Sequence, residues 1–149
     1  MMCIYCRIAT GELPASVVYE DDYTMAFLDI QPINPGHVLV IPKKHASTLM
    51  DLSADDAAHM MVVGQIIDRA LNWSDLKCEG VNIFLADGRV AGQDVAHIHL
   101  HVFPRFQGDG FELKIDPDSR KPPSREELSE NAIKLKQAIS ALHYAQTED

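Results

Sequence analysis

Residues 97–101 read HIHLH, within the longer run AHIHLHVFPR at residues 96–105. Successive side chains of a β-strand point to opposite faces, so His97, His99 and His101 are predicted to share one face, with neighbours about 6.6 Å apart along the strand. The aliphatic residues that alternate with them would anchor the other face in a core: Ile98, Leu100 and Val102. This run therefore predicts a strand with one apolar face and one imidazole face.

A row of three imidazoles has three interpretations. It could be a polar, solvated face, although such faces usually carry threonine and other β-branched residues. It could supply the three protein ligands of an open catalytic zinc site. It could also hold a nucleophilic histidine with neighbours that assist it. The row alone does not separate the last two interpretations.

The residues before the row favour phosphate chemistry. A histidine that attacks phosphorus needs donors for the charge that develops on the oxygens. AGQD at residues 91–94 contains Gly92, which permits close approach of backbone N–H groups to a phosphate, and Gln93, which adds an amide donor. An ordinary loop is the alternative for these residues.

The hydrophobic pattern predicts an α+β fold. Strand-like segments occupy residues 16–20, 24–30, 37–42, 80–86 and 96–105. The first two are separated by an acidic stretch that is typical of a hairpin turn. The five segments together predict an antiparallel sheet of about five strands, with one main helix and a C-terminal helix.

The main helix is predicted to begin after Ser53, which can cap it, and to end near Asn72. Its predicted apolar face comprises Met61, Ile66, Ile67, Ala70 and Leu71. The capping-box pattern SREE at residues 124–127 opens the last helix, which continues to about Ala145. Residues 107–123 are predicted to be mostly loop, with FELKI at 111–115 as a possible short strand.

Length and charge limit the function classes. A chain of 149 residues predicts a single domain over residues 1–149. Its net charge of -9 disfavours a nucleic-acid polymer as partner but allows a small anion in a local pocket. No apolar run approaches the roughly 20 residues of a membrane span, and the N-terminus lacks the features of a signal peptide. The sequence therefore predicts a cytoplasmic protein that does not associate with membranes.

The stretch AGQDVAHIHLHVFPR resembles the signature of the histidine triad (HIT) family, in which alternating histidines follow a Gly-Gln pair. Upstream, residues 3–45 are similar to the N-terminal half of bacterial members. The resemblance covers residues 3 to about 106, the core motif region, and leaves 107–149 as a variable segment. It implies a HIT-like fold whose sheet extends across a homodimer.

The resemblance also implies a two-step nucleotidyl transfer or hydrolysis. His99 would attack the α-phosphorus of an AMP-like purine nucleotide and form a nucleotidyl-histidine, which water or another acceptor resolves. His101 and His37 would contact the phosphate and assist proton transfer, and Asp29 would bind the ribose hydroxyls. Residues near the first hairpin are candidates for the base pocket or, equally, for the core: Ile4, Ile8, Phe27 and Ile30.

Two positions depart from the family pattern. The family often has Asn or Gln at the position of Ala86, so a polar contact is lost. It often has Ser or Thr at the position of Asp94, which is predicted to lie beside the substrate. A carboxylate there cannot donate to the departing group unless it is protonated, and it repels phosphate. The preferred leaving group is therefore predicted to shift toward a neutral or cationic amine.

Cys3 and Cys6 form a C-x-x-C pair, which alone could be a redox pair, half of a zinc site or chance. The resemblance implies that they bind one structural zinc ion per chain, together with His45 and His97. A closed site with four protein ligands leaves no position for a substrate, so the metal would contribute folding energy instead.

Three functions remain from the sequence. The first is an enzyme, a nucleoside phosphoramidase or dinucleoside polyphosphate hydrolase that acts through His99. The second is a nucleotide-binding regulatory or scaffold protein with little turnover, which Ala86 and Asp94 keep open. The third is a metal-dependent enzyme that uses the histidine row as ligands.

Overall fold

A computed structural model of the chain describes residues 3–114 and 121–146. The chain divides into two compact units, Met1–Phe111 and Glu112–Asp149. The first contains the sheet and the predicted site residues, and the second contains the last helix. The prediction that both belong to a single domain stays a prediction.

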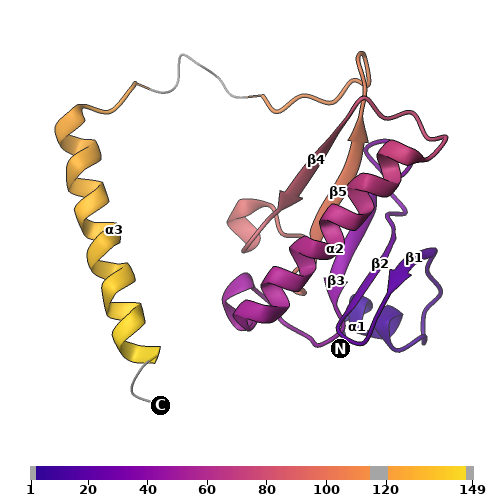
Figure 1. The fold of residues 1–149 in the computed structure, drawn as a ribbon, viewed down its shortest axis with the longest axis horizontal. Coiled ribbons are helices and arrows are strands. Elements are labelled where there is room, and N and C mark those ends of the chain that lie inside the picture. Colours follow the sequence, from indigo (N-terminus) through magenta and orange to yellow (C-terminus); the bar gives the residue numbers. More distant parts are fainter. Residues whose placement is uncertain (1–2, 115–120, 147–149) are drawn as a thin grey trace. The chain divides into compact units, whose positions relative to one another are not determined.

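The first unit is, as predicted, an α+β fold around one five-stranded antiparallel sheet, and its strands lie in the order β1-β2-β3-β5-β4 (Figure 1). Its strands are β1 (Val17–Glu20), β2 (Thr24–Leu28), β3 (Val38–Pro42), β4 (Gly80–Leu85) and β5 (Leu100–Arg105). The histidine-bearing strand β5 lies inside the sheet, between β3 and β4. Strand β4 forms one edge.

Alternation along the strands gives the sheet two different faces. One face, with Ala26, Val38 and Val40, belongs to the core cluster that also contains the buried residues of helix α2 (Ala54–Trp73). The other face, with Met25, Phe27, Leu39 and Ile41, packs around Tyr5. Ile98, Leu100 and Val102 are buried on the α2 side, which confirms the predicted apolar face of the histidine run.

Strand β5 begins at Leu100, four residues later than predicted, so only His101 of the row lies in the strand. The register of β3 against β5 pairs Val40 with Leu100. Continuing it would bring Ile98 opposite Pro42, which has no N–H to donate. The Ile98 N–H instead donates to the Ala46 carbonyl at 2.7 Å, and the chain bends away from the ladder.

Helix α2 begins as predicted, because the Ser53 hydroxyl accepts the Asp56 N–H at 3.0 Å. Its buried face comprises Met60, Val63, Gly64, Ile67 and Leu71. The predicted face was wrong at Met61, Ile66 and Ala70, all of which are exposed, Met61 and Ile66 by 52% and 38%. The buried residues follow a spacing of three or four, whereas Met61 and Ile66 flank that stripe. Gly64 lets the helix approach β5 closely, since a Cβ there would lie 2.8 Å from the Leu100 side chain.

The first helix, α1 (Ile4–Ala9), was not predicted. It has six residues, and its N-cap, Cys3, makes no side-chain capping bond, so the usual signals are missing. Its buried residue, Tyr5, anchors it to the sheet face opposite α2. This helix carries Cys6, and Cys3 immediately precedes it.

The second unit contains helix α3 (Arg125–Gln146), as predicted. Its capping box is formed: the Ser124 N–H donates to the Glu127 carboxylate at 2.7 Å, and the Glu127 N–H donates to the Ser124 hydroxyl at 3.1 Å. Residues 111–114 of the possible strand FELKI are not in a strand, and Ile115 lies outside the described residues. Within the described ranges, none of the helices has the length and apolar character needed to cross a membrane.

Candidate active site and metal centre

The three histidines of the row lie together on the α1 side of the sheet. The rings of His99 and His101 have centroids 4.8 Å apart, and the Tyr5 ring packs edge-on against His97 at 5.8 Å and His99 at 5.2 Å. His97 and His99 are buried. The common face predicted from the alternation therefore holds, although the strand ladder includes only His101.

A backbone carbonyl sets the proton position on His99. The His99 Nδ1 lies 2.8 Å from the His97 carbonyl oxygen. A carbonyl only accepts, so Nδ1 carries the proton and donates it. In the neutral ring, Nε2 then has a free lone pair, which is the form that a nucleophile requires.

His37 and His101 form a hydrogen-bonded pair whose protons are also set by the backbone. The Ile33 N–H donates to His37 Nδ1 at 3.1 Å, so the proton of the neutral ring is on Nε2. That Nε2 lies 2.9 Å from His101 Nδ1 and donates to it. His101 consequently carries its own proton on Nε2, which remains available as a donor.

Burial keeps both rings of this pair neutral near pH 7. It lowers the pKa of His37, although the Asp29 carboxylate opposes the shift. Burial, with the nearby His99 and His37, lowers the pKa of His101 to about 4. The pair is therefore a chain of neutral donors from the Ile33 amide to His101 Nε2.

Asp29 follows β2 and lies beside His37, with its Oδ2 3.7 Å from His37 Nε2. Its Oδ1 accepts the Gln31 N–H at 2.8 Å, and its backbone N–H donates to the His37 carbonyl at 2.9 Å. The carboxylate is held in place, and Oδ2 keeps acceptor capacity for a ligand hydroxyl.

Gln93 holds the loop before the row. Its amide nitrogen donates to the Ser47 carbonyl at 2.7 Å and to the Val95 carbonyl at 2.9 Å, and its amide oxygen accepts the Gly88 N–H at 2.8 Å. Both amide hydrogens are engaged by backbone carbonyls. The predicted contact between Gln93 and substrate stays a prediction, and it would require one of these bonds to be given up.

The two departures from the family pattern have different surroundings. Ala86 is buried, so this position offers a methyl group and no polar contact. Asp94 is on the surface and its Oδ1 lies 3.4 Å from His99 Nε2. The carboxylate thus stands directly beside the nitrogen with the free lone pair.

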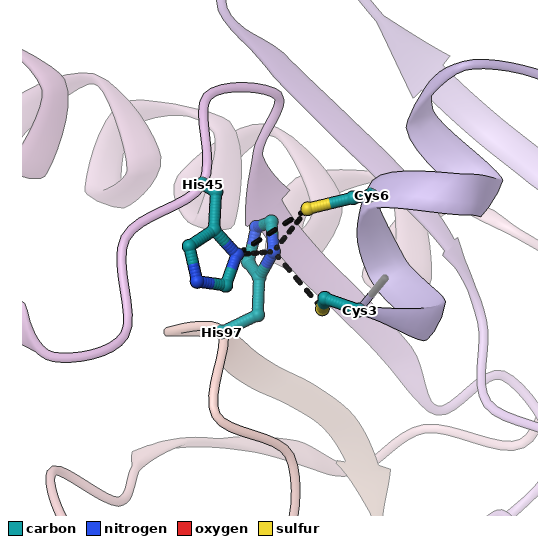
Figure 2. A group of neighbouring side chains, drawn as sticks. All are labelled: Cys3, Cys6, His45 and His97. Atoms are coloured by element: carbon teal, nitrogen blue, oxygen red, sulfur yellow. Dashed lines mark hydrogen bonds between the residues drawn. The ribbon is translucent and has the colours of Figure 1, made fainter. Parts of the chain in front are cut away.

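A second cluster brings together the four residues predicted to bind zinc (Figure 2). In Figure 2 the two cysteines approach from α1, and the rings of His45 and His97 face them. The Nδ1 atoms of the two rings are 3.3 Å apart. The Cys6 sulfur lies 3.3 Å from His45 Nδ1 and 3.5 Å from His97 Nδ1, and the Cys3 sulfur lies 3.5 Å from His97 Nδ1.

These spacings match those of ligands around a tetrahedral zinc ion. Zn–N bonds of about 2.05 Å and Zn–S bonds of about 2.3 Å give roughly 3.3 Å between nitrogens and roughly 3.6 Å between nitrogen and sulfur. The His97 Nε2 donates to the Pro42 carbonyl at 2.8 Å, which leaves Nδ1 as a lone pair directed at the cluster. The Ser47 hydroxyl lies 3.3 Å from His45 Nε2, on the side of that ring away from the cluster. The donor set fits zinc.

The HIT domain family model matches residues 10–108 of the chain. The chain belongs to the histidine triad family. Members of this family are nucleotide-binding hydrolases and transferases. The family match spans β1 to β5 and so includes every strand of the sheet described above.

Individual relatives support this assignment. An uncharacterized HIT-like protein of Methanocaldococcus jannaschii is 45% identical over 113 residues, 76% of this chain and 86% of that protein. The adenosine 5'-monophosphoramidase hnt1 of Schizosaccharomyces pombe is 36% identical over 105 residues, 70% of this chain and 75% of that protein. The crystal structure of a Zn-bound histidine triad family protein from Mycobacterium smegmatis has a TM-score of 0.73 and 42% identity, over 97% of this chain and 98% of that one.

The site contains a second group of possible metal ligands, formed by Asp29, His37 and His101. This group is less suited to a metal than the cysteine and histidine cluster. Ligation through His37 Nε2 would require that nitrogen to lose its proton and Nδ1 to gain one. The Ile33 N–H points at Nδ1 from 3.1 Å, so the two hydrogens would clash. Because His97 also directs Nδ1 toward the cysteines, the row does not present three free ligands to one metal.

Some site residues of this HIT protein were not predicted from the sequence. Tyr5 packs against His97 and His99, and the Ile33 amide fixes His37. Buried Asn34 holds the Ile33 loop by donating to the Pro104 carbonyl and the Asp109 carboxylate, both at 2.9 Å. A backbone N–H has no sequence signature, and Asn34 looks like ordinary loop composition between two prolines.

The base-pocket candidates divide by burial. Phe27 is buried in the cluster around Tyr5, and Ile8 packs against that cluster, so both have core roles. Ile4 is 48% exposed and Ile30 is 94% exposed. Their proposed contact with a base stays a prediction.

Proposed function

We propose that this HIT protein is a nucleoside phosphoramidase or dinucleoside polyphosphate hydrolase that acts at the α-phosphate of an AMP-like purine nucleotide. The observation that supports this best is the arrangement of protons in the row. His99 Nδ1–H is bound to the His97 carbonyl, which leaves Nε2 as a lone pair, and His101 Nε2–H is left as a donor. In the neutral rings, a lone pair on His99 and a proton donor on His101 thus stand side by side.

In the first step the His99 Nε2 lone pair attacks the α-phosphorus and forms an N–P bond. The bond from phosphorus to the leaving amine or phosphate breaks, and the leaving group takes that electron pair. His101 gives its Nε2 proton to the leaving atom, so an amine departs as RNH₂; the His101 ring is left as an imidazolate beside the positively charged nucleotidyl-imidazolium of His99. His37 donates to His101 Nδ1 and keeps that ring oriented.

In the second step water attacks the nucleotidyl-His99. Its proton goes to His101 Nε2, the N–P bond breaks, and the electron pair returns to His99. The nucleoside monophosphate leaves and both rings regain their starting forms. Asp29 would bind the ribose hydroxyls through Oδ2, the oxygen that the Gln31 amide does not occupy.

One structural zinc ion per chain would be held by Cys3, Cys6, His45 and His97. When bound, the ion supplies energy that cross-links α1 to two other segments: the one after β3 that carries His45 and the one before β5 that carries His97. Tyr5 belongs to α1, lies between Cys3 and Cys6 in the sequence, and packs against the His99 ring. Holding α1 in place would therefore also hold the Tyr5 ring against the proposed nucleophile. Zinc content below about 0.3 per chain, in protein prepared without chelator, would contradict this closed four-ligand site.

The competing function is a nucleotide-binding regulatory or scaffold protein with little turnover. It is favoured by Asp94, whose carboxylate stands 3.4 Å from His99 Nε2, and by Gln93, whose amide hydrogens are already engaged. Both features reduce the donors available to the developing charge.

AMP release from an adenosine phosphoramidate separates these functions. Wild type is expected to release AMP, and His99→Ala is expected to lose this activity by at least about 10³-fold while still binding AMP in calorimetry. Binding without turnover in wild type would establish the regulatory alternative. Immediate loss of turnover on adding EDTA, with the fold intact by circular dichroism, would establish a catalytic metal instead.

We also propose a cytoplasmic homodimer joined through β4. This strand forms a sheet edge, and its Ile83 and Phe84 are 41% and 44% exposed. An unpaired apolar edge is a template for pairing with a second copy. Ile83→Lys is expected to shift sedimentation from dimer to monomer, and a wild type that sediments as a monomer would refute the pairing.

A further inference from the structure

Asp94 places a carboxylate beside the proposed nucleophile. Its Oδ1 lies 3.4 Å from His99 Nε2, and its side chain is 77% exposed. The Val95 N–H donates to the same oxygen at 2.9 Å, which holds the carboxylate at the rim of the site. Asp94 therefore lies outside the core and close to the nitrogen of the proposed nucleophile.

The carboxylate lies within reach of a leaving group's charge. A phosphorus that Nε2 attacks lies about 3–3.5 Å from that nitrogen. Since Asp94 Oδ1 is 3.4 Å from the same nitrogen, it lies within about 7 Å of the phosphorus in any direction of approach. The first atom of the leaving group is bonded to that phosphorus.

A second carboxylate near the row has the same sign as Asp94. Asp29 lies beside His37, with its Oδ2 3.7 Å from His37 Nε2. Both carboxylates lie close enough to His101 to oppose the lowering of its pKa. Together they disfavour a leaving group that carries several phosphates.

We propose that Asp94 selects the leaving group by its charge. It favours a nucleoside phosphoramidate whose departing amine carries a second, cationic group, and it disfavours the anionic leaving groups of dinucleoside polyphosphates. This rests on the proposed function and uses the same bonds: His99 Nε2 joins phosphorus, the P–N bond breaks, and the amine leaves with the electron pair and a proton from His101.

Coulomb's law gives the size of the effect. One unit of leaving-group charge at about 7 Å from the carboxylate changes kcat/KM by about 3-fold at a dielectric constant of 80, and by about 50-fold at 20. Because Asp94 is largely exposed, the lower part of this range is expected.

The experiment uses three adenosine phosphoramidates of matched length, made from 1,4-diaminobutane, pentylamine and 5-aminopentanoate. Their leaving groups are cationic, neutral and anionic. AMP release gives kcat/KM for the full-length wild type, Asp94→Asn and Asp94→Ser. Asp75→Asn removes the same charge from an exposed position and serves as the control. Thermal unfolding checks that each variant is folded.

Wild type is expected to prefer the cationic over the neutral substrate, and the neutral over the anionic. Each ratio should fall by about 3-fold or more in both Asp94 variants and stay unchanged in Asp75→Asn. AMP release with ratios that change less than 2-fold in the Asp94 variants would overturn this inference and leave the proposed function standing. No AMP release from any of the three substrates would overturn the proposed function, and this inference with it.

Discussion

Replacing Ile33 by proline removes a single N–H, and the consequence for the site can be followed from ring to ring. That N–H donates to His37 Nδ1 at 3.1 Å, and His37 is buried. Without it, His37 either keeps an unpaired Nδ1 or moves its proton there. In the second case His37 Nε2 becomes an acceptor, His101 must donate from Nδ1, and His101 Nε2 loses the proton proposed for the leaving group.

The magnitude follows from the cost of the unpaired nitrogen. The Ile33 N–H pairs Nδ1 only in the productive proton arrangement, and a buried acceptor that loses its partner costs about 1–3 kcal/mol, so the preference for that arrangement falls by about 5- to 150-fold. We expect kcat for phosphoramidate hydrolysis to fall in Ile33→Pro, by up to about this factor. Ile33→Ala keeps the N–H and should retain activity within about 2-fold.

Nitrogen-15 NMR of the histidine rings gives a readout independent of rate. The His37 signals should change from the Nε2–H form to the Nδ1–H form in Ile33→Pro and remain unchanged in Ile33→Ala. Thermal unfolding and zinc content show whether the proline variant is folded. A folded Ile33→Pro with wild-type kcat, or with an unchanged His37 proton position, would refute the reasoning.

Three further predictions concern the fold. Cys6→Ser is expected to lower zinc content and the unfolding temperature together, and an unchanged zinc content would refute the assigned ligand set. Gly64→Ala should destabilise the protein by about 1–3 kcal/mol in urea unfolding, because its Cβ would lie 2.8 Å from Leu100, and a gain in stability would refute that contact. Burial raises the pKa of Asp21, but hydrogen bonds from His59 and from other donors outweigh this and hold that pKa well below its usual range. The carboxylate therefore stabilises the fold above about pH 4, and this contribution is lost as the pH falls. Asp21→Asn should make the free energy of unfolding less dependent on pH in the acid range, and an unchanged dependence would contradict this assignment.

Much of the sheet could be predicted from local patterns. The hairpin, the buried strand β3, the cap at Ser53 and the capping box at Ser124 each depend on a few neighbouring residues. Helix α1 could not be predicted in the same way, because Tyr5 reaches the sheet and the cysteines reach His45 and His97 across the fold. Its stability comes from these distant contacts and not from capping.

The buried face of α2 shows a further limit. Met61 and Ile66 are as apolar as the residues that are buried, and only the orientation of the helix over β5 decides which stripe faces the core. That orientation includes the close approach of Gly64 to Leu100, a contact between residues far apart in the chain. Hydrophobicity alone does not rank neighbouring apolar positions.

The order of residues was enough to indicate which chemical groups the protein brings to its site. Alternation in HIHLH places imidazoles on one face, and the C-x-x-C pair supplies two soft ligands, because side-chain direction and donor type are local properties. Only the tertiary structure decided what each ring does. The carbonyls of His97 and Pro42 and the amide of Ile33 determine which nitrogens carry protons, and a proton's place depends on partners that the fold brings within about 3 Å.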